Sequence, residues 1–141
     1  MSNYAKMLGM LAFAIAMLLP ATASAKDKGQ TLYMFGFAAS FNDSTVYITD
    51  IQAVPNARLT RKHNHLVDRN DYSYQLRNHL VQQSPDSHPT VVTFFAKNQK
   101  DATKKYDKIY RKYTAKAKGR YIVVFIKQEE FKYQPIAQEQ E

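Results

Sequence analysis

Positive charge is concentrated in one segment of the chain, residues 97–120. This segment holds ten of the 20 Lys and Arg residues but two of the 12 acidic residues, a net charge of +8. Its apolar residues recur with the period of about 3.6 residues that is typical of an amphipathic helix, so we expect a helix over Asn98–Lys118. On this helix we expect Tyr106, Ile109, Tyr110 and Tyr113 to face inward and the cations to share the outer side.

Five of these cations are our candidate anion-binding residues: Lys104, Lys105, Lys108, Arg111 and Lys112. A stripe of this kind attracts polymers rich in phosphate or carboxylate, or anionic lipid headgroups, through a field that salt screens. The alternative interpretation is a charged surface that only keeps the protein in solution.

The sequence carries no pattern that predicts catalysis, a metal site or a cofactor. His63 and His65 come nearest to a metal motif, but no long-range ligand pattern such as H-E-x-x-H accompanies them. The chain has no Cys, which excludes a thiolate nucleophile, thiolate-bound zinc and iron–sulfur clusters. A nucleophile elbow, a Gly-rich phosphate loop and carboxylates placed to flank a cleft are also missing. We therefore assign no catalytic residue, no metal and no cofactor.

The N-terminal 25 residues have the three parts of a secretory signal peptide in the usual order. Lys6 provides a positive charge, Met7–Leu19 is an uninterrupted apolar run, and Ala23-Ser24-Ala25 matches an A-x-A cleavage site. A membrane-spanning helix needs about 20 apolar residues, which is more than this run supplies. We expect cleavage after Ala25 and a periplasmic or secreted protein.

Four runs of residues predict β-strands. The β-formers of Thr31–Phe41 and Thr45–Val54 flank turn residues, so they predict a β-hairpin. Thr90–Ala96 and Arg120–Lys127 are almost continuously apolar, which is typical of strands buried on both faces. From these runs we expect Phe94, Phe95, Val123 and Phe125 to be largely buried or at a protein interface.

A second helix is expected between the hairpin and the third strand, over Asp71–Gln83, with Tyr72, Leu76 and Leu80 as its buried stripe. The element order ββαβαβ predicts an α+β fold, a mixed four-stranded sheet with two helices packed on it. The helices could cover one face and leave the other bare, or lie one on each face. We expect a signal peptide over 1–25, a single domain over 26–134 and a flexible polar tail over 135–141.

Two segments, Phe35–Gln52 and Arg69–Arg77, resemble a family of small exported proteins of Bacteroidales-type bacteria that has no known function. The resemblance implies export and a single domain. It implies no ligand, no cofactor and no catalytic residue.

The sequence favours a small exported binding or assembly module that contacts an anionic envelope component, with two alternatives. The partner would be an anionic glycan, lipopolysaccharide or lipid headgroups, and export disfavours nucleic acid. One alternative is a hydrolase or other enzyme whose site is not visible in the sequence. The other is a structural subunit that forms a homodimer or buries its sheet face in a protein partner.

Overall fold

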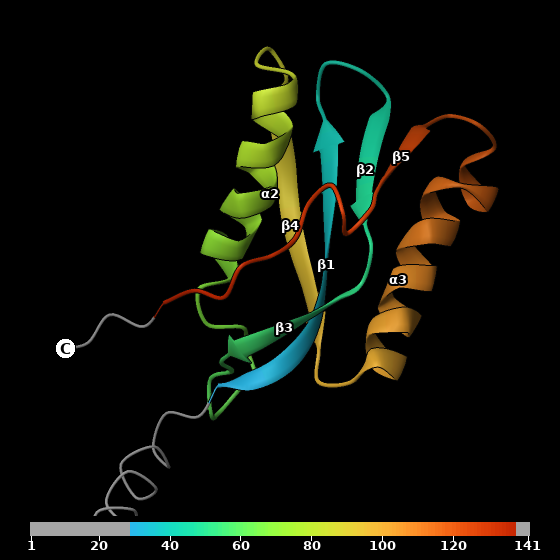
Figure 1. Cartoon of the computed structure of the whole chain (residues 1–141). Helices are drawn as coiled ribbons and strands as arrows, with labels where there is room; N and C mark the ends of the chain where they lie inside the picture. The colour runs from blue at the N-terminus through green and yellow to red at the C-terminus, as the bar shows by residue number, and fades with distance from the viewer. Residues whose placement is uncertain (1–28, 138–141) are drawn as a thin grey trace, which may run out of the picture.

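A mixed β-sheet with one helix on each side forms the protein in the computed structural model, which describes residues 29–137 (Figure 1). The elements follow the order β1 (Gln30–Ser40), β2 (Thr45–Thr49), β3 (Gln52–Ala57), α2 (Arg69–Gln83), β4 (Pro89–Ala96), α3 (Gln99–Tyr113), a 3-10 turn (Ala115–Ala117) and β5 (Ile122–Ile126). The predicted α+β class and the mixed sheet with two helices are confirmed. The predicted signal peptide lies outside the described residues.

β1 is the central strand, and its two ends have different partners along one edge. Its first half pairs with β3 and its second half with β2, both antiparallel, while β4 pairs antiparallel along the other edge. The predicted β1–β2 hairpin is confirmed, but the run Thr45–Val54 is two strands and not one. Where the partner changes, the Thr49 hydroxyl accepts a hydrogen bond from the Gly36 amide at 2.8 Å and replaces the missing ladder bond.

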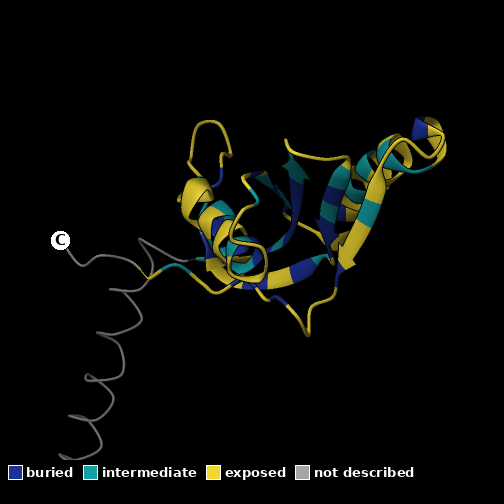
Figure 2. Ribbon diagram, turned by 90° about the horizontal axis from the view of Figure 1, so that it is seen from above, coloured by how far each residue is buried: buried dark blue, intermediate teal, exposed yellow. Residues whose placement is uncertain are grey.

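β5 pairs parallel with β2 and has no second neighbour among the described strands. It therefore lies at an edge of the sheet, as do β3 and β4, which each pair with β1 alone among the described strands. The prediction that Arg120–Lys127 is buried on both faces is wrong, because Ile122, Val124 and Phe125 are exposed and only Ile126 of the strand is buried. Figure 2 shows the contrast between the buried central strand and the mostly exposed edge strand β5.

The alternation of β1 side chains divides the core between the two faces of the sheet. Leu32, Met34 and Ala38 point toward α2 and join the larger core cluster. Phe35 and Phe37 point the other way and pack against α3 in a second, mainly aromatic cluster. Of the two helix arrangements left open by the sequence, the structure has one helix on each face (Figure 1).

The predicted stripe of α2 is buried, whereas in α3 Ala102 is buried and Tyr106, Ile109 and Tyr113 are half-buried against the sheet; α3 differs from the expectation in two further respects. Tyr72, Leu76 and Leu80 of α2 are buried as expected. α3 ends at Tyr113 and not at Lys118, because Thr114 leaves helical geometry and a short 3-10 turn follows. The expectation that Tyr110 faces inward is wrong; its side chain is 41% exposed, since it lies at the border of the buried stripe beside β5.

The C-terminal segment after β5 crosses the α2 face of the sheet and is held there by two glutamine side chains (Figure 1). The buried Gln52 side chain donates to the Phe131 carbonyl at 2.8 Å and accepts from the Tyr133 amide at 2.7 Å. Gln75 of α2 makes the same pair of bonds to the carbonyl and amide of Gln134, at 2.9 and 2.8 Å. Each glutamine side chain thus makes the two hydrogen bonds that the backbone of a neighbouring strand would otherwise make. Phe131 and Tyr133 are buried in the larger core cluster.

Candidate functional site

The five candidate anion-binding residues all lie on the solvent side of α3. The helix begins at the N-cap Asn98, whose side-chain oxygen accepts a hydrogen bond from the Asp101 amide at 2.8 Å. The inner side of the helix faces the sheet. Tyr106 and Ile109 pack against the aromatic core cluster, and Ala102 is fully buried. Lys104, Lys108 and Arg111 follow one another at spacings of four and three residues, so they share the opposite, exposed side.

Two of the five candidates differ from the others because they contact neighbouring groups. The Lys105 ammonium donates to the Phe95 carbonyl at 2.6 Å and lies 5.2 Å from the centre of the Phe95 ring. The Lys112 ammonium lies 5.5 Å from the centre of the Tyr113 ring. Lys105 is therefore tied to the edge of the sheet, and the cations free to meet a ligand are centred on Lys104, Lys108 and Arg111.

The charge of this surface is not compensated by ion pairs. Within residues 29–137 the single ion pair closer than 4.0 Å joins Arg58 to Asp68, far from α3 in the sequence. Lys104, Lys108 and Arg111 line a surface hollow of about 350 Å³ together with Asp107 and Lys116. One carboxylate among four cations leaves the hollow with an excess of positive charge, which favours an anionic ligand.

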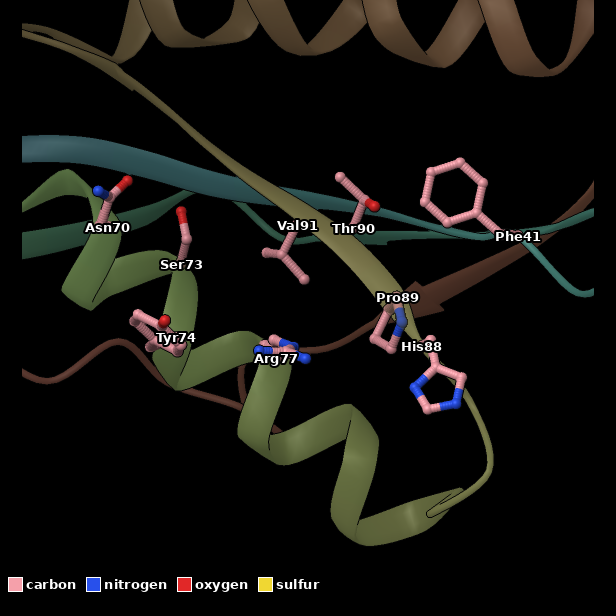
Figure 3. Close-up of a pocket in the computed structure, with 9 residues that line it drawn as sticks. All are labelled: Phe41, Asn70, Ser73, Tyr74, Arg77, His88, Pro89, Thr90 and Val91. Atoms are coloured by element: carbon pink, nitrogen blue, oxygen red, sulfur yellow. The ribbon is translucent and has the colours of Figure 1, made fainter.

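A second concave surface lies between α2 and the free edge of β4 and has a volume of about 590 Å³ (Figure 3). Asn70, Ser73, Tyr74 and Arg77 reach it from α2. It is completed by Phe41 of the β1–β2 turn, by His88 of the loop before β4, and by Pro89, Thr90 and Val91 of β4. Sequence reasoning missed this groove, because only the packing of α2 on β4 brings these segments together.

The groove is lined by polar, cationic and aromatic side chains. It contains a serine and a histidine, but its lining residues include no carboxylate that could orient the imidazole. The Ser73 hydroxyl is hydrogen-bonded to the Thr93 hydroxyl at 2.8 Å, on the wall of the groove. Arg77 presents a cation to the groove, and Tyr74 and Phe41 present aromatic rings, a combination that suits a small anionic or flat ligand.

The histidines do not assemble a metal centre in the described part of the chain. The rings of His63 and His65 are 5.6 Å apart, centre to centre, on a surface loop. No group of three or more His, Asp or Glu side chains within residues 29–137 is placed to hold a metal ion. His79 instead contacts the Phe131 ring, with 5.4 Å between ring centres.

Three tyrosines have perturbed acidity, and burial is the main cause for each. Burial raises the pKa of Tyr133 to about 12, and its hydrogen bond to Thr93 acts in the opposite direction. Burial also raises the pKa of Tyr72 and of Tyr106, and for Tyr106 the Asp50 carboxylate adds to the effect. These hydroxyls stay neutral at physiological pH, so they act as packing and hydrogen-bonding groups.

The fold and the two surfaces define a cysteine-free α+β domain without a recognisable catalytic constellation in its described residues. No protein-family model, curated protein or solved structure matches the chain. Within residues 29–137, no helix combines the length and the apolar character needed to span a membrane.

Proposed function

We propose that the protein is an exported binding module that holds an anionic envelope component against the outer side of α3. The observation that carries this proposal is the row Lys104, Lys108 and Arg111, exposed on one side of a helix and without an ion-pair partner among the described residues. Phosphate or carboxylate groups of a glycan, of lipopolysaccharide or of lipid headgroups are the chemistry that such a row attracts.

Contact of this kind would take place at the surface of the ligand and not by insertion into a membrane. The apolar side of α3 is already used, because Tyr106, Ile109 and Tyr113 pack against Phe35, Phe37 and their neighbours on the sheet. A membrane-inserting helix needs its apolar side free. Electrostatic attraction would therefore supply most of the binding free energy.

Export is part of the proposal and is supported by the charge, the apolar run and the A-x-A site of residues 1–25. N-terminal sequencing of the protein recovered outside the cytoplasm should begin at Lys26. Recovery of the chain with Met1 intact would exclude this cleavage.

We do not propose catalysis, although a cryptic enzyme was an alternative from the sequence. The groove between α2 and β4 has Ser73 and His88 on its lining but no acid beside them. A nucleophile needs an oriented base to be activated, and the lining does not provide one.

The proposal is tested by binding to acidic glycans, lipopolysaccharide and anionic vesicles as a function of salt. The triple variant Lys104→Gln, Lys108→Gln, Arg111→Gln keeps good helix formers and leaves the buried side of α3 unchanged. If each of the three cations releases close to one counterion, the variant should lower the slope of log affinity against log salt by roughly 3.

The matched control removes the same charge elsewhere: Arg61→Gln, Lys62→Gln, Lys132→Gln, three exposed residues outside α3. We expect the control to bind nearly as the wild type does. Equal loss of binding in both triple variants would mean that net charge, and not the α3 surface, is responsible. A wild-type protein that binds none of these polyanions at low salt would leave the helix as a solubilising surface.

A further inference from the structure

Two of the free edges of the sheet, those of β4 and β5, differ in the side chains that surround them. β4 pairs only with β1, and β5 pairs only with β2, among the strands that the structure describes. A free edge exposes backbone amides and carbonyls that can pair with another strand, and proteins usually block such an edge with charged side chains.

The edge of β4 is blocked by two cations. The Arg69 guanidinium donates from Nε to the Thr93 carbonyl at 2.9 Å, and the Lys105 ammonium donates to the Phe95 carbonyl at 2.6 Å. Both cations also lie over the Phe95 ring, at 5.7 and 5.2 Å from its centre. An incoming strand would have to displace both of them.

The edge of β5 has no such protection. The Ile122 amide donates to the Ser44 carbonyl at 2.9 Å, and the Ile126 carbonyl accepts from the Asp50 amide at 3.1 Å. These residues therefore turn their backbone groups toward β2, and by alternation Val123 and Phe125 turn theirs outward. No side chain within residues 29–137 hydrogen-bonds to these outward groups of Val123 and Phe125.

The side chains around the β5 edge are also apolar and exposed. Ile122 is 64% exposed, Val124 38% and Phe125 45%. The Tyr110 ring of α3 lies 5.9 Å from the Phe125 ring and extends this apolar surface. Thr103, Asp107 and Thr114 lie on the Tyr110 side of α3, at spacings of seven, three and four residues, so this side of the helix carries no cation near the edge.

We propose that β5 pairs antiparallel with β5 of a second copy of this chain, about a two-fold axis at Val124. The strand Ile122–Ile126 contains no charged residue, so its backbone can pair without burying a charge. In this register Val123 lies opposite Phe125 of the second copy, which is a favourable pair of a β-branched and an aromatic side chain. Both residues have outward backbone groups, as a hydrogen-bonded antiparallel pair requires.

The charges that flank β5 favour a second copy in this orientation. Lys118 and Arg120 precede the strand, a net charge of +2, and Lys127, Glu129 and Glu130 follow it, a net charge of −1. Antiparallel pairing brings the basic start of one strand to the acidic end of the other, whereas parallel pairing would place like charges together. The two copies of β5 are thus complementary in charge to each other, and this complementarity does not depend on the proposed anion binding by α3.

The solution mass of the protein, purified after expression of the full-length chain, tests this pairing. Light scattering should show a mass that doubles as the concentration is raised to about 0.5 mM, as mass action requires. Val124→Lys places two ammonium groups opposite each other at the axis and should halve the mass at the same concentration. The control Thr90→Lys, at the exposed β4 edge, should leave the doubled mass unchanged, with circular dichroism checking that both variants fold.

Crosslinking tests the register, and the absence of Cys from the chain makes the result simple to interpret. Val124→Cys should form a disulfide-linked dimer on mild oxidation, because residues opposite each other on adjacent strands lie within disulfide reach. Ile122→Cys, on the same edge and more exposed, should crosslink poorly because its own copy lies several residues away. A wild-type protein that stays monomeric at the highest concentration, a Val124→Lys variant that still dimerises, or equal crosslinking of the two cysteine variants would each overturn the proposal.

Discussion

Replacing Tyr133 by Phe should change how the stability of the protein depends on alkaline pH. The Tyr133 side chain is 2% exposed, its hydroxyl lies 3.3 Å from that of Thr93, and burial raises its pKa to about 12. An unfolded tyrosine has a pKa of about 10. Below pH 10 the hydroxyl is neutral in both states and contributes no pH dependence. Between pH 10 and 12 the unfolded chain ionises first, so the wild-type protein loses stability as the pH rises.

The size of the effect follows from the two pKa values. At pH 11, ionisation of this group raises the equilibrium constant for unfolding by about a factor of 10, which corresponds to about 1.4 kcal/mol of lost stability. At pH 8 the Phe variant should be less stable than the wild type by roughly 1 kcal/mol, because it lacks the hydrogen bond to Thr93. At pH 11 the difference should vanish or reverse.

Urea denaturation at pH 8 and pH 11 measures this change. The raised pKa values of Tyr72 and Tyr106 are common to both proteins, so their contribution cancels when the two free energies of unfolding are subtracted. Tyr74→Phe, at an exposed position of α2, controls for the substitution itself. A difference between the wild type and Tyr133→Phe that is the same at both pH values would refute the assignment of a buried, neutral hydroxyl to Tyr133.

Two further predictions concern the core. Gln52→Leu should lower the free energy of unfolding by roughly 2–4 kcal/mol in urea denaturation, because it leaves the buried amide of Tyr133 and carbonyl of Phe131 without partners. The control Gln75→Leu, which removes exposed hydrogen bonds, should lower it by less than about 1 kcal/mol. Equal losses in the two variants would contradict the reasoning. Phe35→Ala should cost about 3–5 kcal/mol, since its ring is fully buried and stacks on Phe94 at 5.0 Å. Phe125→Ala, measured at a concentration where the chain is a single copy, should cost less than about 1 kcal/mol, and a larger loss would mean that Phe125 is part of the core.

The sequence was sufficient to predict the elements whose stability is local. The period of α3, its Asn98 cap and the Tyr72, Leu76 and Leu80 stripe of α2 are all properties of short segments. The wrong prediction for β5 has a physical reason. A continuous apolar run shows that burial of the strand would be favourable, but not whether another part of the same chain covers it. The division of Thr45–Val54 was also not predictable, because it depends on β1 changing partners at Gly36.

The candidate site could be predicted in part. The sequence placed Lys104, Lys108 and Arg111 on one side of a helix, since that follows from spacing alone. It did not reveal that Lys105 binds the Phe95 carbonyl, or that α2 and β4 enclose a groove with Phe41 and His88. Both depend on contacts between segments that are distant in the sequence. The C-terminal boundary is another such case, because Ile136, placed in the expected flexible tail, packs against the core cluster.

The glutamine bonds to the C-terminal segment have a consequence for the order of events during synthesis. Gln52 is joined to Phe131 and Tyr133 across 79 and 81 residues of chain. Contacts that span such separations form late and slowly, because the intervening chain must first be closed into a loop. A nascent chain that ends before Tyr133 has no partner for the Gln52 amide and an incomplete core beneath α2. We therefore expect the fold to close only after Tyr133 has left the ribosome, so that the segment from β1 to β5 stays incompletely folded until then.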